Sequence, residues 1–393
     1  MTVPPAIRPL GMAIVCFCLL PAALHAADAP KDMRAAVDGA VGPLMKEYDV
    51  PGLAVAVTVD GQHYFFNYGI ASKAAQKPVS EDTLFEIGSV SKTFTAVLAG
   101  YVQTLGKLSF DDHPSKFMPE LRHSAVDAAT LLNLGTFTAG GLPLQFPDDL
   151  RTDAEMKTYF RQWKPSAKAD TERQYSNPSI GLLGHIAALA MKKSFSVLVE
   201  TEIFPRLGLR HSYIHVPAAA MGDYAWGYNK AGKPIRVNPG MFDAEAYGIK
   251  SSAADMIRFV DANIRPDTLE EPIRHAVEET HIGYFKSGEL VQGLGWEQYP
   301  YPVTLERLLA GNSNTMTMDV HAATRLTPPR DGAEPTLFDK TGSTNGFSAY
   351  VAFVPAKKIG LVLLANKNIP IPARVTAAYA VLDTLTRASA RLQ

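Results

Sequence analysis

Patterns of alternating apolar residues near both ends of the chain limit the possible folds more than any other feature of the sequence. In segment 53–59 large apolar residues alternate with smaller ones, Asp60-Gly61 is a typical hairpin turn, and "HYFFNYG" at 63–69 returns as a second strand. Near the other end, "AYVAFVP" at 349–355 and "IGLVLLAN" at 359–366 predict two more strands with a short connection. Each end of the chain is therefore expected to supply a hairpin.

Amphipathic helices accompany the two hairpins. Apolar residues recur at helical spacing from Met33 to Tyr48 and again from Val375 to Leu385, and each pattern predicts a helix. Pro43 inside the first segment is a local exception, because proline removes a helical hydrogen bond. The middle of the chain has mostly helical and loop patterns. We therefore predict an α/β fold of the α+β type, with an antiparallel sheet flanked by helices and an inserted helical domain.

The same layout predicts the domain boundaries. Residues 27–105 and 231–393 are expected to form the α/β domain, and residues 106–230 the mainly helical one. A cleft between two such domains is the usual place for an active site. The chain is 47% hydrophobic and 20% charged, which is ordinary for a globular protein with a large core. Its formal net charge of -1 gives no basic surface for binding nucleic acid.

The first 26 residues have the pattern of a signal peptide. Arg8 precedes the apolar run "GMAIVCFCLLPAALHA" at 11–26, which ends in small residues and is too short for a convincing membrane span. A retained membrane anchor is the alternative. We expect cleavage near Ala26 or Ala27, export to the periplasm and no membrane attachment afterwards. Cleavage would remove both cysteines, Cys16 and Cys18, so packing rather than disulfides must stabilise the mature chain.

Ser89 and Lys92 lie three residues apart in "FEIGSVSKTFTA" at 85–96, a segment that is otherwise typical of a buried helix. Residues at this spacing share one face of a helix, and Ser89 is expected to open that helix. A serine hydroxyl becomes a nucleophile when a neighbour takes its proton, and a buried lysine can do so after losing its charge. The S-x-x-K pattern alone is weak, because it occurs by chance in a chain of this length.

Two further short motifs follow in the chain. Tyr175 and Asn177 precede Pro178, which suits the first turn of a helix, so both side chains are expected on a loop facing a cleft. A capping turn with a surface tyrosine is the alternative. Lys340 begins "KTGS", just before a strand pattern, where it could bind an anionic group. The amide of Ser343 would then stabilise an oxyanion together with the amide of Ser89.

In this order, the three motifs resemble those of the class C serine β-lactamases, and so do the longer segments around them. The matching segments are "LFEIGSVSKTFTAVLAGY", "TAGGLPLQFPDD", "YSNPSIGLLG", "DAEAYGIKSS", "DKTGSTNGF" and "LANKNIPIPARV". The resemblance covers essentially the whole mature chain. It implies a β-lactamase that hydrolyses the β-lactam amide, preferably of cephalosporins, and that works without a cofactor.

The resemblance also implies residue roles. Ser89 would be the acylated nucleophile and Lys92 its partner in proton transfer, while Tyr175 would help to deprotonate Ser89 or the hydrolytic water. Whether Tyr175 or Lys92 is the general base stays open. The residues implied to contact the substrate are Gln145, Asn177, Tyr247, Lys340, Thr341, Ser343 and Arg374.

Two departures and two alternatives accompany this reading. Ile371 stands where many relatives have asparagine, and Ile369 replaces a common tyrosine, which leaves leaving-group recognition open. A D-Ala-D-Ala carboxypeptidase or penicillin-binding protein, or a related serine esterase, would share the nucleophile. His211 and His215 lie four apart but without an acidic partner, so we expect no metal site. We expect a monomer whose partner is a small β-lactam.

Overall fold

The computed structural model describes residues 1–2, 29–332 and 334–390. The expected signal peptide falls almost wholly on residues 3–28, outside this part of the chain. The predicted hairpin at the N-terminal end is confirmed as β1 (Gly52–Val59) and β2 (Gln62–Ser72), which pair in the antiparallel register Val59↔Gln62. The predicted hairpin at the other end is β16 (Ser348–Val354) with β17 (Ile359–Ala365).

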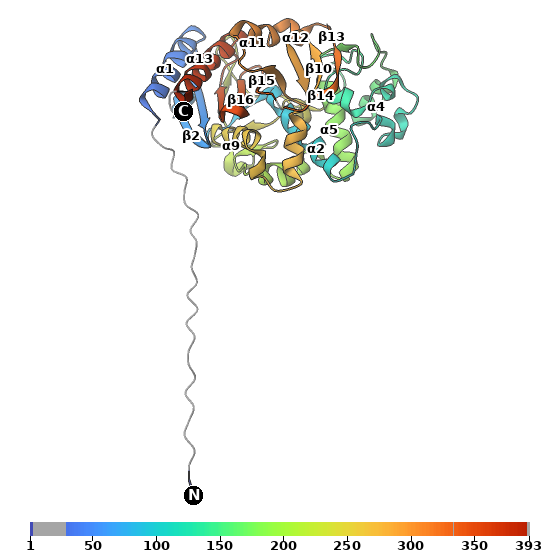
Figure 1. The fold of residues 1–393 in the computed structure, drawn as a ribbon, viewed down its shortest axis with the longest axis horizontal. Coiled ribbons are helices and arrows are strands. Elements are labelled where there is room, and N and C mark those ends of the chain that lie inside the picture. The colour runs from blue at the N-terminus through green and yellow to red at the C-terminus, as the bar shows by residue number, and fades with distance from the viewer. Residues whose placement is uncertain (3–28, 333, 391–393) are drawn as a thin grey trace.

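One large antiparallel sheet joins the two hairpins, which are neighbours in it (Figure 1). Its strand order is β14-β10-β11-β12-β15-β16-β17-β1-β2-β3, and Leu53 of β1 pairs with Ala365 of β17. The remaining strands are β3 (Lys77–Pro78), β10 (Gly283–Ser287), β11 (Leu290–Gly293), β12 (Glu297–Pro300), β14 (Thr324–Arg330) and β15 (Thr336–Ser343). Every strand of this sheet comes from outside residues 106–230, while the division into two domains stays a prediction.

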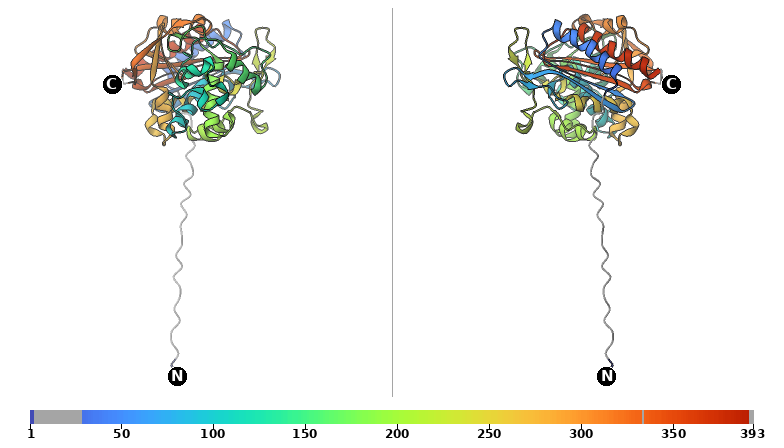
Figure 2. Two further views of the ribbon diagram at one scale, coloured as in Figure 1. Left: turned by 90° about the vertical axis from the view of Figure 1, so that its right-hand side faces the viewer. Right: turned by 90° about the vertical axis from the view of Figure 1, so that its left-hand side faces the viewer.

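The sheet buries both of its faces. On one face, α1 (Lys31–Glu47) and α13 (Ile371–Ala390) lie side by side, as the right-hand view of Figure 2 shows. Successive residues of β17 explain this, because Leu361 and Leu363 pack with the α1–α13 layer while Val362 and Leu364 pack on the opposite side. Pro43 stays within α1, so the predicted first helix is continuous.

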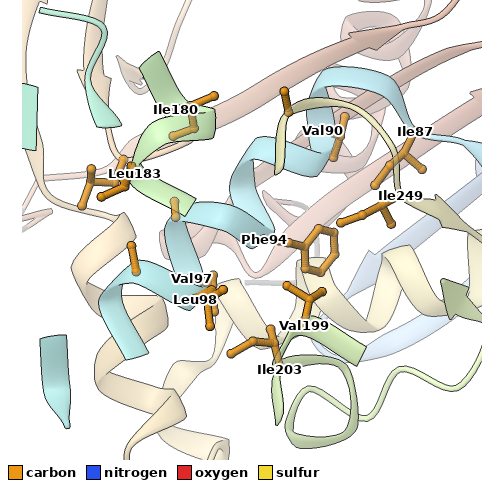
Figure 3. Packing of buried hydrophobic residues seen from close by; sticks show 14 of the residues in the cluster. Ile87, Val90, Phe94, Val97, Leu98, Ile180, Leu183, Val199, Ile203 and Ile249 are labelled. Carbon is orange, nitrogen blue, oxygen red and sulfur yellow. The ribbon is translucent and has the colours of Figure 1, made fainter. Parts of the chain in front are cut away.

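The second face is covered by helices that surround α2 (Ser91–Thr104). The principal ones are α5 (Asn177–Met191), α9 (Ala253–Ile264) and α10 (Ile273–Thr280). Figure 3 shows Phe94, Val97 and Leu98 of α2 in one apolar cluster with side chains of α5 and of other segments, among them Ile180, Leu183, Val199, Ile203 and Ile249. Twelve residues of α2, from Ser91 to Val102, are buried. A helix buried on all sides holds its side chains rigidly, which suits a segment next to a reacting group.

Short elements complete the chain between these layers. The helices are α3 (Leu131–Gly135), α4 (Asp153–Gln162), α6 (Phe195–Leu198), α7 (Phe204–Arg206), α8 (Asp243–Ala246), α11 (Leu305–Gly311) and α12 (Asn314–Met318). The small sheets are β4 (Phe85–Glu86) with β9 (Lys250–Ser251) and β6 (Ser212–Tyr213), β5 (Glu172–Arg173) with β13 (His321–Ala322), and β7 (Gly227–Tyr228) with β8 (Pro234–Ile235). No single helix of the described residues has the length and hydropathy of a membrane span. Two neighbouring segments, Asn177–Met191 and Phe195–Arg206, have that length and hydropathy only when taken together, and the chain bends by 77° between them.

Candidate active site

Ser89 lies on a tight turn at the edge of the central sheet. A 3₁₀ turn (Gly88–Val90) leads into α2, so the helix begins two residues later than the sequence suggested. Gly88 has φ +53, and a Cβ atom there would lie 2.4 Å from the backbone nitrogen of Ser343. Only glycine fits so close to β15 in this conformation. The turn therefore brings Ser89 against the end of β15.

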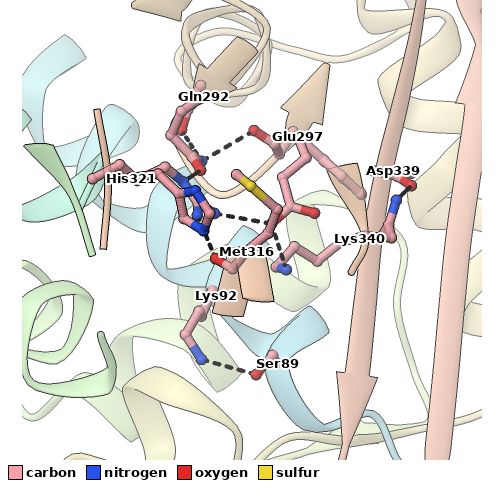
Figure 4. Close-up of polar contacts among 12 residues, drawn as sticks. Ser89, Lys92, Gln292, Glu297, Met316, His321, Asp339 and Lys340 are labelled. Atoms are coloured by element: carbon pink, nitrogen blue, oxygen red, sulfur yellow. Dashed lines mark hydrogen bonds and ion pairs between the residues drawn. The ribbon is translucent and has the colours of Figure 1, made fainter. Parts of the chain in front are cut away.

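Lys92 lies directly beneath Ser89 and is fully buried. Its Nζ donates to the Ser89 Oγ at 3.0 Å and to the Ala246 carbonyl at 2.8 Å, as Figure 4 shows for the serine. Neither partner carries a negative charge. Burial therefore dominates and lowers the pKa of Lys92, although the Tyr175 phenol acts in the opposite direction. A lysine in this setting can release a proton far more readily than one in water.

Tyr175 faces the same serine from the segment before α5. Ser176 caps that helix by accepting a hydrogen bond from the Ser179 backbone at 3.0 Å, which fixes the turn that carries the tyrosine. The Tyr175 hydroxyl is buried and forms no hydrogen bond within the described residues. The Nζ atoms of Lys92 and Lys340 each lie 5.0 Å from its ring centroid. Burial raises the pKa of Tyr175, but the two lysine charges outweigh burial and the net shift is downward.

Lys340 reaches the site from β15 and has an acidic partner. Its Nζ lies 3.1 Å from the Glu297 Oε1 (Figure 4). The Arg173 guanidinium approaches the same carboxylate at 3.4 Å. Burial lowers the pKa of Lys340, but the charge of Glu297 more than compensates and the net pKa is raised. Arg173 is itself held by the Gln292 Oε1 at 2.8 Å and by the Met316 carbonyl at 2.8 Å. A buried cluster of alternating charge thus supports Lys340.

The end of β15 also brings two backbone amides together. A Cβ atom on Gly342 would lie 1.9 Å from the Ile87 carbonyl and 3.1 Å from the Ser89 nitrogen, so the two segments touch there. Arg374, on α13, stabilises the end of β15, because it donates to the Gly342 carbonyl at 2.8 Å and to the Ser343 Oγ at 2.9 Å. Burial lowers the pKa of Arg374 to about 9.

A cleft of about 430 Å³ opens above Ser89. Nine of the ten residues predicted from the sequence line it, and Lys92 lies underneath. The nine are Ser89, Gln145, Tyr175, Asn177, Tyr247, Lys340, Thr341, Ser343 and Arg374. Ile371 lines the cleft as well, whereas Ile369 is fully buried away from it.

Sequence reasoning missed several residues of this site. The cleft is also lined by Leu144, Val237, Asn238, Thr317, Thr344 and Asn345. Glu297 and Arg173, below Lys340, were missed too, because single charged residues carry no local pattern. The only signal for Glu297 is its position in a strand that pairs with β15, where it lies opposite Asp339.

The histidines lie apart from this site. The Nε2 of His211 is 4.0 Å from an Asp82 oxygen, and both side chains are well exposed. Within the described residues, no group of three or more His, Cys, Asp or Glu side chains is arranged to hold a metal ion.

The chain is similar to known β-lactamases over most of its length. The family model described as Beta-lactamase matches residues 37–386. A β-lactamase of Pseudomonas fluorescens is 52% identical over 354 residues, which cover 90% of this chain and 99% of that protein. A β-lactamase of Escherichia coli (strain K12) is 40% identical, covering 94% of this chain and 98% of that one.

Solved structures show the same similarity in three dimensions. A class C β-lactamase in complex with cefoxitin superposes with a TM-score of 0.87 at 49% identity, covering 90% of this chain and 98% of that one. A D-alanine carboxypeptidase from Burkholderia cenocepacia gives a TM-score of 0.86, also at 49% identity, with 90% and 99% covered. The chain therefore belongs to the β-lactamase family of hydrolases, and within that family to class C.

Proposed function

We propose that this protein hydrolyses β-lactams through an acyl-enzyme on Ser89. The observation that carries the proposal is the 3.0 Å contact between the Lys92 Nζ and the Ser89 Oγ, beside the Tyr175 phenol and at the floor of the cleft. These groups can take the serine proton because burial lowers the pKa of Lys92 and the lysine charges lower that of Tyr175.

Acylation follows from this arrangement. The Ser89 oxygen attacks the β-lactam carbonyl while its proton passes to the Lys92–Tyr175 pair. The Ser89 and Ser343 amides stabilise the oxyanion. When the C–N bond breaks, the pair returns the proton to the leaving nitrogen. Lys340 and Thr341 bind the substrate carboxylate, while Gln145 and Asn177 bind the amide side chain next to Tyr247.

Deacylation reuses the same groups. A water molecule attacks the ester carbon and gives its proton to the Lys92–Tyr175 pair, and the ester C–O bond breaks as that proton returns to the Ser89 oxygen. The product is the ring-opened acid, and the enzyme is regenerated.

The substitution Ser89→Ala tests the nucleophile. We expect hydrolysis and covalent labelling by a β-lactam to disappear while the fold is kept. The matched control is Ser91→Ala, since Ser91 lies two residues away and its hydroxyl accepts from the Ile249 amide at 3.1 Å. Intact-mass and peptide spectra should show one adduct in the parent and in Ser91→Ala, and none in Ser89→Ala. An adduct that persists in Ser89→Ala would contradict the proposal.

A D-alanyl carboxypeptidase is the second candidate, because two structural neighbours carry that activity in their names. Both reactions would use Ser89, so the substrate must decide between them. We propose that cephalosporins are the preferred substrates, in line with the class C resemblance. Turnover of a chromogenic cephalosporin should exceed one per enzyme and should be much faster than release of D-alanine from a peptide ending in D-Ala-D-Ala.

We also propose that the mature protein begins near Ala26 or Ala27 and acts in the periplasm as a monomer. The charged and apolar pattern of residues 8–26 supports export. N-terminal sequencing of the exported protein, cell fractionation and light scattering test these three points.

A further inference from the structure

Glu86 is a buried carboxylate three residues before Ser89, and it accepts hydrogen bonds from three separate segments. Glu86 is only 1% exposed to solvent. Oε1 accepts from the Tyr224 hydroxyl and from the Val237 backbone amide, both at 2.7 Å. Oε2 accepts from the Thr344 hydroxyl at 2.6 Å. Three such bonds compensate for much of the cost of burying a carboxylate.

Two of these donors belong to walls of the cleft. Val237 and its neighbour Asn238 line one side, and Thr344 and Asn345 line another. Thr344 follows Ser343, whose amide faces the Ser89 turn. Neither segment is part of a helix or of the large sheet at these positions. The Thr344 amide donates to the Phe347 carbonyl at 3.1 Å, and the contacts with the Glu86 side chain hold both walls in addition.

Aromatic packing supports the same arrangement from below. The Arg236 guanidinium lies 3.8 Å from the Tyr224 ring centroid and 4.2 Å from that of Trp226, which fixes the residue before Val237. Phe347 packs against Tyr224 with ring centroids 6.4 Å apart. Glu86 thus lies at the point where the turn of the nucleophile and both walls meet.

We propose that Glu86 is a positioning residue for catalysis, because its carboxylate ties the 237–238 and 344–345 walls to the turn that carries Ser89. It touches neither the substrate nor the reacting atoms. This inference rests on the proposed function. In addition, it assigns to Glu86 the role of fixing the width of the cleft around the Ser343 amide and around the side chain of the bound substrate.

The kinetic test compares Glu86→Met with Glu86→Gln. Methionine fills the space without an acceptor, whereas glutamine keeps an oxygen for Val237 and Tyr224 and an amide group that Thr344 can face. We expect Glu86→Met to slow acylation of Ser89 at saturating cephalosporin by about 10- to 100-fold per labelled site, because small misplacements of binding groups are costly. Glu86→Gln should recover most of the rate.

Asp255→Leu is the matched control. Asp255 is also buried and accepts from a backbone amide, that of His211 at 2.6 Å, and from a hydroxyl, that of Ser212 at 2.8 Å, but neither partner lines the cleft. Both substitutions should lower the melting temperature. Only Glu86→Met should lower the acylation rate per labelled site. Equal rates in Glu86→Met and Asp255→Leu would show that Glu86 is merely structural and would overturn the inference.

Hydrogen exchange makes the test independent of turnover. In Glu86→Met the amides of 237–238 and 344–345 should exchange faster than in the parent, while Asp255→Leu leaves them unchanged. If Glu86→Met does not fold, Thr344→Val against Thr344→Ser tests the 344–345 wall alone in the same way. Unchanged exchange of the walls overturns the inference. A parent protein that is never labelled at Ser89 would instead overturn the proposed function, and the exchange result would still decide the role of Glu86.

Discussion

Two buried lysines flank Tyr175, and their surroundings push their proton affinities in opposite directions. Lys92, on α2, donates to a hydroxyl and a carbonyl, and burial lowers its pKa. Lys340, on β15, is equally buried but contacts the Glu297 carboxylate, and its pKa is raised. Burial alone therefore does not decide which lysine keeps its charge. The partner decides, and the same side chain can serve as a proton carrier on one side and a fixed cation on the other.

The largest effect is expected from the Lys92 side of this comparison. In Lys92→Arg the positive charge remains but cannot be released at any ordinary pH. If Lys92 must lose its proton, acylation should slow towards the upper end of the range of about 10²–10⁴-fold for lost acid–base catalysis. Single-turnover acylation measures this loss, with circular dichroism as the folding control. Near-parent acylation in Lys92→Arg would show that only the charge is needed.

Tyr175→Phe removes the group between the two lysines and should have a somewhat smaller effect. The ring still packs, so stability should change little, while turnover falls by about 10²–10³-fold. Lys340→Ala should weaken apparent binding and slow acylation together. Because Lys340 acts partly through Tyr175, the double variant should lose much less than the product of the single losses. Acylation and deacylation rates of all three variants check this, and near-parent turnover in Tyr175→Phe would leave the proton to Lys92 alone.

Glu297→Gln tests whether the carboxylate keeps Lys340 charged. We expect kcat/KM to fall by about 10-fold near neutral pH. Without the carboxylate, the pKa of Lys340 should fall, so the charged form is lost at lower pH than in the parent. KM for a cephalosporin carboxylate should then begin to rise at lower pH. The methyl ester of the same cephalosporin is the control, because it lacks the anion. If KM in Glu297→Gln begins to rise at the same alkaline pH as in the parent, the role given to the Lys340–Glu297 ion pair is contradicted.

The smallest effect concerns stability alone. Burial, with the charge of Glu297, raises the pKa of Asp339 to about 8 from an ordinary value of 3.8. The folded protein therefore keeps a proton that the unfolded chain releases, and the stabilisation present below pH 3.8 is lost as the pH rises to about 8. Asp339→Asn should be more stable than the parent by about 1 kcal/mol or more at pH 9 and nearly equal at pH 4.

Urea unfolding at the two pH values measures this difference. The Asn312 amide and the Tyr350 hydroxyl contact the Asp339 Oδ2 at 2.7 and 2.9 Å, and asparagine keeps an oxygen for these groups. A constant difference between the two proteins at both pH values would mean that the carboxyl does not titrate in this range.

The parts of this site that the sequence predicts are those with a local pattern. Ser89 and Lys92 were placed together because residues at positions i and i+3 share one face of a helix. Tyr175 was placed by Pro178 at the start of a helix, and Lys340 by the strand that follows it. The terminal hairpins were predicted because alternation and turns are local as well. Local patterns did not show that the helix starts at Ser91, since the 3₁₀ turn is imposed by the close approach of β15.

Glu297 and Glu86 needed the folded chain. Each is an isolated acidic residue in the sequence, and the role of each depends on hydrogen-bond partners that are far away along the chain. Glu297 meets Lys340 because β12 pairs with β15, and Glu86 meets Thr344 because the Ser89 turn touches the end of that strand. Register and close approach of this kind are consequences of packing, which a single sequence does not display.

The seam between β1 and β17 has a consequence for how the protein reaches its final form. Leu53 of β1 pairs with Ala365 of β17, which lies near the other end of the chain. A chain emerging from the ribosome therefore cannot pair β1 with β17 until nearly all of it has been made. Such distant closure is slow. Until β17 is made, the edge of β1 stays unpaired, and an unpaired strand edge can pair with other chains.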